Sequence, residues 1–253
     1  MTSPNIEILA HEESPLGALC LRRRRLLSEP DTVVTEITLN HEFLMSSHHT
    51  ASERALATEA LDLHHGTELQ VLVGGLGLGY TACEVLASNR VKRVGVAEML
   101  PQVIDWMRGG LVPLSTALNA DTRFDPLVCD VYALLSEPPQ RQFDLILIDV
   151  DHSPAETLTG RNAGFYTEAG LERAREHLAP GGVLGVWSCA ENSAFAGALR
   201  RTFAEVRATP VTFRNRHAGE EQTDWLYFGR MPATGKDRPE TRGGASGVPR
   251  LSP

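Results

Sequence analysis

The sequence predicts an α/β protein with a doubly wound, mainly parallel sheet, an antiparallel C-terminal hairpin and a small N-terminal β unit. Three observations predict this class. From residue 69 onward, short apolar strands alternate with helical segments; a glycine-rich turn follows the first of these strands; and two strand-like segments with no helix between them come last. Continuous apolar strands interleaved with helices indicate a parallel sheet that helices cover on both faces, as in Rossmann-like folds.

The expected elements follow from the spacing of apolar residues and from the turn residues between them. Strands of the main sheet are expected near 69–75, 91–98, 123–130, 143–150 and 181–188, and helices near 79–88, 100–109, 131–136 and 166–178. The closing hairpin is expected from 204–213 and 223–230. Before the sheet, short strands are expected at 6–10, 17–27 and 32–39, followed by a helix with Ser52 as its N-cap.

Composition excludes several classes of partner. The net charge of -8 and the isoelectric point near 5.6 argue against a nucleic acid or a membrane surface, because the average protein surface would repel phosphate groups. The four cysteines are scattered and no secretory signal is present, which predicts a cytoplasmic protein. No set of His and Cys residues has the spacing of a zinc site, so no metal is expected. The stretch "RRRR" at 22–25 predicts a solvated strand edge or a subunit contact, the latter in a homodimer.

The glycine-rich turn lies in the stretch "VLVGGLGLGYTACEVL", residues 71–86. Gly75, Gly77 and Gly79 fall where the first strand of the main sheet passes into its helix. In open α/β sheets, ligands bind outside the carboxyl ends of the strands, and bare backbone there lets a ligand approach the amide groups closely. The alternative is that the glycines serve only the geometry of the turn and the packing of helix against strand.

Acidic side chains end the next three strands: Glu98 the second, Asp130 the third and Asp149 the fourth. Glu98 comes nineteen residues after Gly79, where a carboxylate can accept hydrogen bonds from ribose hydroxyls. A glycine turn and three acids at four successive strand ends favour a nucleoside site. The turn also matches G-x-G-x-x-A, which is typical of nicotinamide dinucleotide sites, but a carboxylate-lined rim suits a positively charged sulfonium nucleoside better than a pyrophosphate.

With these motifs, residues 1–230 resemble the spermidine synthase (polyamine aminopropyltransferase) family, within the class I S-adenosylmethionine-dependent methyltransferase fold. The glycine stretch is similar to the family's V-L-x-x-G-G-G-D-G-G-x-x-x-E-V-L. Other similar segments are "HEFLMSS" to D-E-F-x-Y-x-E, "VGVAEMLPQVIDWMR" to V-x-x-V-E-I-D-x-x-V-I-x-x-x-R, and "FDLILIDVDHSP" to Y-D-V-I-I-x-D-S-S-D-P. We therefore expect a small N-terminal β unit at 1–50, a nucleoside-binding catalytic domain at 51–230 and a disordered tail, rich in Pro and Gly, at 231–253.

The resemblance implies a role for each residue at the strand ends. The three turn glycines cradle the amino-acid or aminopropyl portion of the nucleoside. Glu98 binds the ribose, Asp130 binds the adenine amino group, and Asp149 is the catalytic acid–base carboxylate. The implied nucleoside is S-adenosylmethionine or its decarboxylated form.

The chain departs from the family pattern on the acceptor side. Leu78 replaces the Asp of the glycine loop, Met45 replaces the Tyr, and His152 aligns with the second Asp of D-S-S-D-P, with Asp151 adjacent. Because the cations of a polyamine need carboxylate or aromatic groups around them, these departures favour methyl transfer to a small-molecule acceptor. Asp149 is then the base, and Asp151 or His152 orients the acceptor. Two alternatives stay open: aminopropyl transfer in polyamine biosynthesis, and a nucleoside-binding protein without catalysis.

Overall fold

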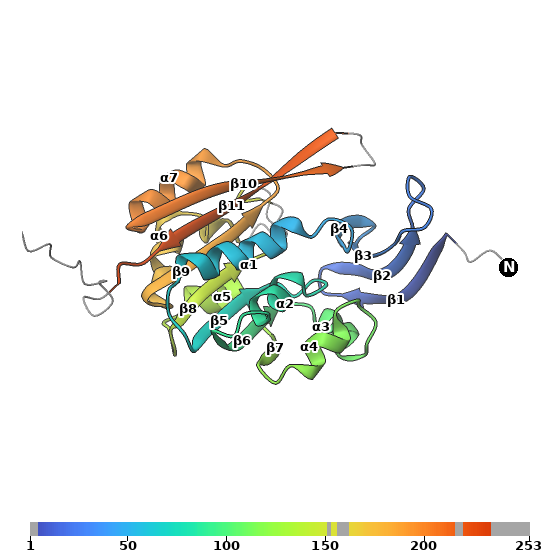
Figure 1. Cartoon of the computed structure of the whole chain (residues 1–253), viewed down its shortest axis with the longest axis horizontal. Helices are drawn as coiled ribbons and strands as arrows, with labels where there is room; N and C mark the ends of the chain where they lie inside the picture. Colours follow the sequence, from blue (N-terminus) through green and yellow to red (C-terminus); the bar gives the residue numbers. More distant parts are fainter. Residues whose placement is uncertain (1–4, 151–152, 156–161, 216–219, 234–253) are drawn as a thin grey trace, which may run out of the picture.

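The computed structural model describes residues 5–150, 153–155, 162–215 and 220–233. An antiparallel sheet of four strands lies at one end of the molecule (Figure 1). Its strands follow the order β1-β2-β3-β4, with bounds β1 (Ile6–Ser14), β2 (Gly17–Arg25), β3 (Val33–Leu39) and β4 (Glu42–Ser46). Each strand therefore pairs antiparallel with the next along the chain, which agrees with the predicted N-terminal β unit.

The second sheet has seven strands in the order β10-β11-β9-β8-β5-β6-β7. Their bounds are β5 (Leu69–Gly74), β6 (Val91–Glu98), β7 (Phe124–Val128), β8 (Phe143–Ile148), β9 (Leu178–Ser188), β10 (Glu205–Asn215) and β11 (Glu220–Arg230). Strands β5 to β9 run parallel, and β11 pairs antiparallel with both β9 and β10. The order of the strands reverses between β5 and β8, which is where open α/β sheets bind their ligands.

Helices cover both faces of the seven-stranded sheet. On β5, Val71 and Val73 pack into one core, whereas Leu72 between them packs into a second core on the other face. This alternation follows from the two-residue period of a strand. The first core contains α1 (Ala51–Leu63), α2 (Tyr80–Leu86), α3 (Pro101–Arg108) and α4 (Ser115–Ala120); the second contains α5 (Val131–Ser136), α6 (Glu168–Glu176) and α7 (Ser193–Thr202). The N-terminal sheet joins the first core through Leu19 and Leu21, so the two sheets share buried apolar surface.

The predicted fold class is confirmed, including the antiparallel closing hairpin. Strand β4 and helices α4 and α7 were not expected from the sequence. Strand β4 and helix α4 are too short to show a hydrophobic period, and the small residues of α7 hide its apolar face. No helix in the described ranges is long and apolar enough to cross a membrane. The predicted division at residues 50 and 230 stays a prediction, and residues 234–253 of the expected tail lie outside the described part.

Gly79 shows how tightly the start of α2 is packed. It is the N-cap of this helix with a φ of 89°, and a Cβ atom there would lie 2.5 Å from Cδ1 of Leu118 and 2.9 Å from Cε of Met107. Gly110 has a similar φ of 80° but nothing within 4 Å of its Cβ position. We expect Gly79→Ala to lower the free energy of unfolding by about 1–3 kcal/mol more than Gly110→Ala, measured by urea denaturation, because both variants carry backbone strain but only the first is overpacked. Equal losses would contradict this account of Gly79.

Candidate active site

A cavity of about 510 Å³ opens at the carboxyl ends of the parallel strands, between the two sheets. Five of the residues that the sequence predicts for the site line it: Gly75, Gly77, Glu98, Asp130 and Asp149. Gly79 is not part of its wall, because its α-carbon faces the core residues Leu118 and Met107. Asp151 and His152 lie outside the described residues, so their predicted role in orienting an acceptor stays a prediction.

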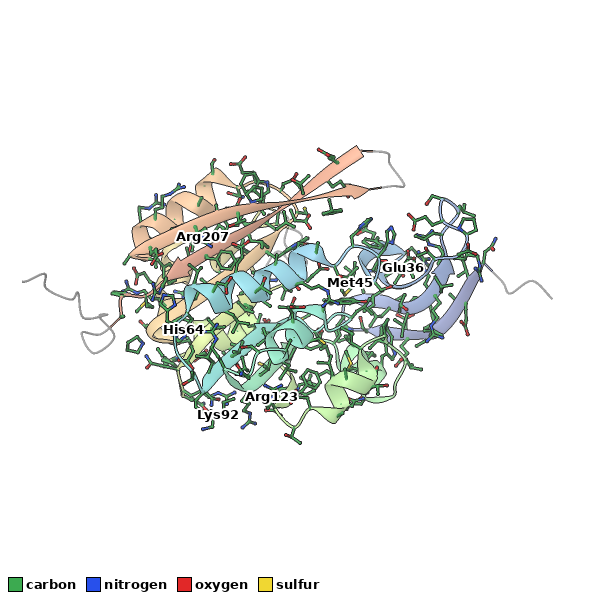
Figure 2. The ribbon with its side chains drawn as sticks, viewed as in Figure 1. Glu36, Met45, His64, Lys92, Arg123 and Arg207 are labelled. Atoms are coloured by element: carbon green, nitrogen blue, oxygen red, sulfur yellow. The ribbon has the colours of Figure 1, made fainter. Side chains whose placement is uncertain are left out.

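The first two glycines of the turn are required by contacts within the protein. Gly75 has a φ of 90°, and a side chain there would collide with the carbonyl oxygen of Asp149. Gly77 has a φ of 50°, and a side chain there would collide with the sulfur of Met45. The same sulfur lies 3.0 Å from the amide nitrogen of Leu78, so Met45 holds the N-terminal sheet against the turn (Figure 2). Packing therefore accounts for both glycines, and any contact with a ligand is a further role.

Glu98 occupies the amide groups that a phosphate would otherwise bind. Its carboxylate accepts hydrogen bonds from the amides of Leu76 at 2.9 Å and Leu100 at 2.8 Å. Burial raises the pKa of Glu98, while hydrogen bonds from these amides and from the amide of Gly77 act in the opposite direction. A pyrophosphate at this turn would have to compete with a fixed carboxylate, so the turn is poorly suited to a dinucleotide.

Asp130 also has a structural task. Its Oδ1 caps α5 by accepting hydrogen bonds from the amides of Tyr132 at 2.9 Å and Ala133 at 3.3 Å. The capped helix holds this carboxylate in the cavity wall, on the same side as Glu98. The predicted adenine contact of Asp130 is thus sterically available but stays a prediction.

Three carboxylates from three different elements line the same cavity. Glu53 comes from α1, Asp149 follows β8, and Asp224 comes from β11. The hydroxyl of Thr81 donates to Oδ2 of Asp149 at 2.7 Å, and the hydroxyl of Ser52 donates to Oδ2 of Asp224 at 2.6 Å. We call Glu53, Asp149 and Asp224 the carboxylate cluster.

Burial raises the pKa of all three acids in the carboxylate cluster. It raises the pKa of Asp149 to about 6, with repulsion from Asp224 adding to the effect and the Thr81 hydrogen bond opposing it. Burial likewise raises the pKa of Glu53 to about 8, and repulsion from Asp149 and Asp224 adds to it. The pKa of Asp224 is also raised by burial. A cation placed among these groups would let them ionise, so the cluster favours a positively charged ligand.

Two members of the carboxylate cluster, Glu53 and Asp224, were not expected from the sequence. Glu53 has the pattern of an ordinary acidic residue in the first turn of a helix, and Asp224 follows a run of polar residues at the start of β11, so neither stands out. The predicted N-cap role of Ser52 is wrong: the N-cap is Thr50, and Ser52 is buried against Asp224. In the described ranges, no three His, Cys, Asp or Glu side chains are grouped so as to hold a metal ion.

The raised pKa of Glu53 predicts how stability depends on pH. The folded protein binds this proton more tightly than the unfolded chain, so the stabilisation is present below the ordinary pKa of 4.5 and is lost as the pH rises towards about 8. We expect wild type to lose about 2–4 kcal/mol of unfolding free energy relative to Glu53→Gln between about pH 5 and pH 9, measured by denaturant titration at each pH. The exposed Glu176 of α6 supplies the control, since Glu176→Gln should follow the wild-type curve. Parallel curves for wild type and Glu53→Gln would refute the burial argument.

No protein-family model matches the chain. In sequence it is 28% identical over 258 aligned positions to polyamine aminopropyltransferase 2 of Pseudomonas aeruginosa, an alignment that covers 91% of this chain and 72% of that protein.

Two solved structures share the fold. Spermidine synthase from Thermotoga maritima superposes with a TM-score of 0.68 at 17% identity, covering 90% of this chain and 73% of that one. Spermidine synthase in complex with the transition state analogue AdoDATO superposes with a TM-score of 0.70 at 20% identity, covering 90% and 74%. The predicted resemblance is thus confirmed: the chain is a homologue of the polyamine aminopropyltransferases and has the class I methyltransferase-like fold of the spermidine synthases.

Proposed function

We propose that this protein is a transferase that moves the aminopropyl group of decarboxylated S-adenosylmethionine to an amine of a small-molecule acceptor. The observation that carries the proposal is the carboxylate cluster, whose three acids line one cavity and favour a cationic amine beside the base Asp149. The similarity to a polyamine aminopropyltransferase supports the same reaction. These findings favour the aminopropyl alternative over the methyl transfer that the departures from the family motifs suggest.

The structure also weakens the physical argument for methyl transfer. Leu78 is fully buried in the core and does not line the cavity, so its replacement of an Asp says less about the acceptor than the sequence alone suggests. Glu53 and Asp224 supply carboxylates that the sequence motifs do not contain. The acceptor side of the site is therefore rich in negative charge, as an amine requires.

For the donor, we assign Glu98 to the ribose hydroxyls, Asp130 to the adenine amino group and the turn at Gly75 and Gly77 to the aminopropyl chain. All four line one cavity, and its acidic wall suits a sulfonium better than a pyrophosphate. A nicotinamide dinucleotide fits less well, since Glu98 already uses the turn amides.

Asp149 has the position and the acidity of a general base. When bound, the donor supplies a carbon next to a sulfonium sulfur; the acceptor nitrogen bonds to this carbon, the carbon–sulfur bond breaks, and its electron pair remains on the sulfur of a neutral thioether. The ionised carboxylate of Asp149 takes the proton that the nitrogen loses. A pKa of about 6 leaves Asp149 ionised at neutral pH yet basic enough to accept that proton.

The first test is product formation. The protein is incubated with 1,4-diaminobutane and either decarboxylated S-adenosylmethionine or S-adenosylmethionine, and products are identified by mass spectrometry. We expect an aminopropylated amine with the decarboxylated donor, and a kcat lowered by about 10²–10⁴-fold in Asp149→Asn with donor binding retained in calorimetry. Asp105→Asn, an exposed position on α3, is the control and should keep wild-type kcat.

Other outcomes of the same test contradict the proposal. Methylated products with S-adenosylmethionine alone would establish the methyltransferase alternative. Donor binding without any turnover in wild type would establish a nucleoside-binding protein. An absorbance change of NAD(H) with a hydroxy or keto substrate would establish a dehydrogenase.

The Thr81 hydrogen bond predicts a shift in the pH profile. Because Asp149 must be ionised to accept the proton, kcat/KM, which reports the free enzyme, should rise with pH through about 6 and then level off. Thr81 donates to the ionised carboxylate, so Thr81→Val should move this midpoint to higher pH and leave the plateau within a few-fold of wild type. Thr202→Val, a buried position in α7 remote from the cavity, should leave the midpoint in place. A midpoint that stays or falls in Thr81→Val would remove Asp149 as the titrating base.

A further inference from the structure

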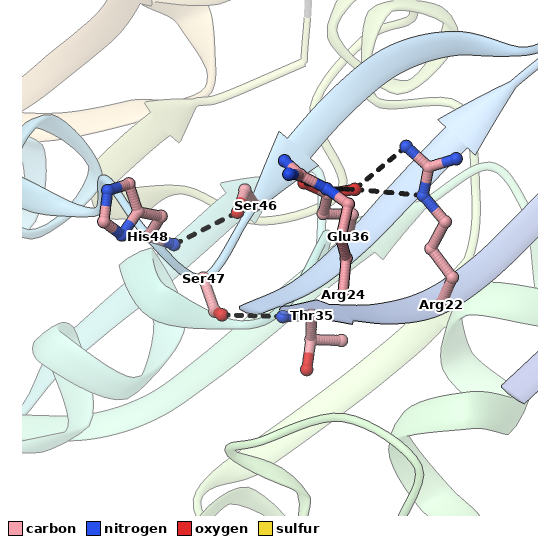
Figure 3. Close-up of polar contacts among 7 residues, drawn as sticks. All are labelled: Arg22, Arg24, Thr35, Glu36, Ser46, Ser47 and His48. Atoms are coloured by element: carbon pink, nitrogen blue, oxygen red, sulfur yellow. Dashed lines mark hydrogen bonds and ion pairs between the residues drawn. The ribbon is translucent and has the colours of Figure 1, made fainter. Parts of the chain in front are cut away.

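Two arginines of the "RRRR" stretch converge on one buried carboxylate (Figure 3). Nη2 of Arg24 lies 2.6 Å from Oε1 of Glu36, and Nε of Arg22 lies 2.9 Å from Oε2. Strand β2 lies between β1 and β3, so the predicted solvated strand edge is wrong, and Arg22 is directly opposite Glu36 in the sheet register. We call Arg22, Glu36 and Arg24 the arginine cluster.

The arginine cluster has a net positive charge, because two guanidinium groups surround one carboxylate. The side chain of Glu36 is 2% exposed; burial opposes its ionisation, but hydrogen bonds from Arg24 and Arg22 outweigh burial and hold its pKa below the ordinary value. One guanidinium would neutralise this carboxylate, yet two are present. Each guanidinium has five N–H groups, and Glu36 engages one edge of each, so donors remain on both.

The surplus charge lies in the wall of the candidate active site. Arg24 and Glu36 line the same cavity as the carboxylate cluster, together with Ser46 and His48 of the neighbouring β4 segment. The arginine cluster belongs to the N-terminal sheet, whereas the carboxylate cluster comes from α1 and the seven-stranded sheet (Figures 1 and 2). The cavity thus has a negative side and a positive side, contributed by different sheets.

We infer that the arginine cluster binds a carboxylate of a small molecule whose amine lies at the carboxylate cluster. A plain diamine would leave the arginine side without a partner, whereas an amino acid matches both sides. A guanidinium edge is the usual partner for such a carboxylate, because it donates two parallel hydrogen bonds. The inference rests on the proposed function for the identity of the two substrates. The carboxylate has two sources: an acceptor of the diamino acid class, or a donor that keeps the carboxylate of S-adenosylmethionine.

Ligand pairs that differ by one carboxylate test the inference by calorimetry, without turnover. On the acceptor side, 2,5-diaminopentanoate is compared with 1,4-diaminobutane in the presence of methylthioadenosine; on the donor side, S-adenosylmethionine is compared with its decarboxylated form. We expect the carboxylated member of at least one pair to bind about tenfold tighter or more. The pair that shows the preference identifies the source of the carboxylate.

Variants of neighbouring arginines link the preference to the cluster. Arg24→Gln should abolish most of the tenfold preference, and Arg24→Lys, which keeps the charge beside Glu36, should retain part of it if Arg24→Gln does not fold. Arg23→Gln is the matched control: its side chain is 45% exposed on the same strand, its Nη1 lies 3.9 Å from Glu7, and it should bind like wild type.

Any one of three results overturns the inference. Either the carboxylated member binds no more tightly than its partner in both pairs, or none of the four compounds binds, or the preference for the carboxylated member survives in Arg24→Gln. Turnover of 1,4-diaminobutane with the decarboxylated donor, without any carboxylate preference, would leave the proposed function standing and remove only this inference. A carboxylate preference lost in Arg24→Gln, together with no transfer product from any pairing of the two donors with the two acceptors, would leave the inference and remove the proposed function.

Discussion

The cavity depends on the close approach of three backbone segments at Gly75 and Gly77. A side chain at the first position would meet the carbonyl oxygen of Asp149, and one at the second would meet the sulfur of Met45. These contacts bring the end of β5 against the end of β8 and bring the N-terminal sheet against the turn. The glycines therefore bring the base and both walls of the cavity together, whichever ligand contacts they also make.

The backbone amides at the glycine-rich turn donate hydrogen bonds to Glu98. The buried carboxyl group accepts from Leu76 and Leu100, so these amides are not available to an anion in the cavity. The pKa values of Asp149 and Glu53 in the carboxylate cluster are raised mainly by burial, with repulsion between the acids adding to the effect. In the proposed function, the positive charges of the donor and of the acceptor would both favour ionisation of these acids.

The sequence predicts the parts of the site that follow from local pattern. Apolar strands reveal the parallel sheet, and the carboxyl ends of parallel strands meet at one edge, which is why Glu98, Asp130 and Asp149 line one cavity. Glu53 and Asp224 could not be found in this way, because the first comes from a helix before the sheet and the second from an antiparallel strand inserted between β9 and β10. Their meeting depends on the order of strands in space, which local spacing does not contain.

The arginine cluster depends on register in the same way. Arg22 and Arg24 share a face of β2 because side chains alternate along a strand, but only the pairing of β2 with β3 places Glu36 between them. The charge on this side of the cavity is therefore set by the N-terminal sheet, while the nucleoside positions are set by the seven-stranded sheet. Arg22, Arg24 and Glu36 all belong to the N-terminal sheet, whereas Glu98 ends β6 and Asp130 follows β7 in the other sheet, and both bind backbone amides there. The charge of the arginine cluster can therefore change without altering the hydrogen bonds that hold Glu98 and Asp130.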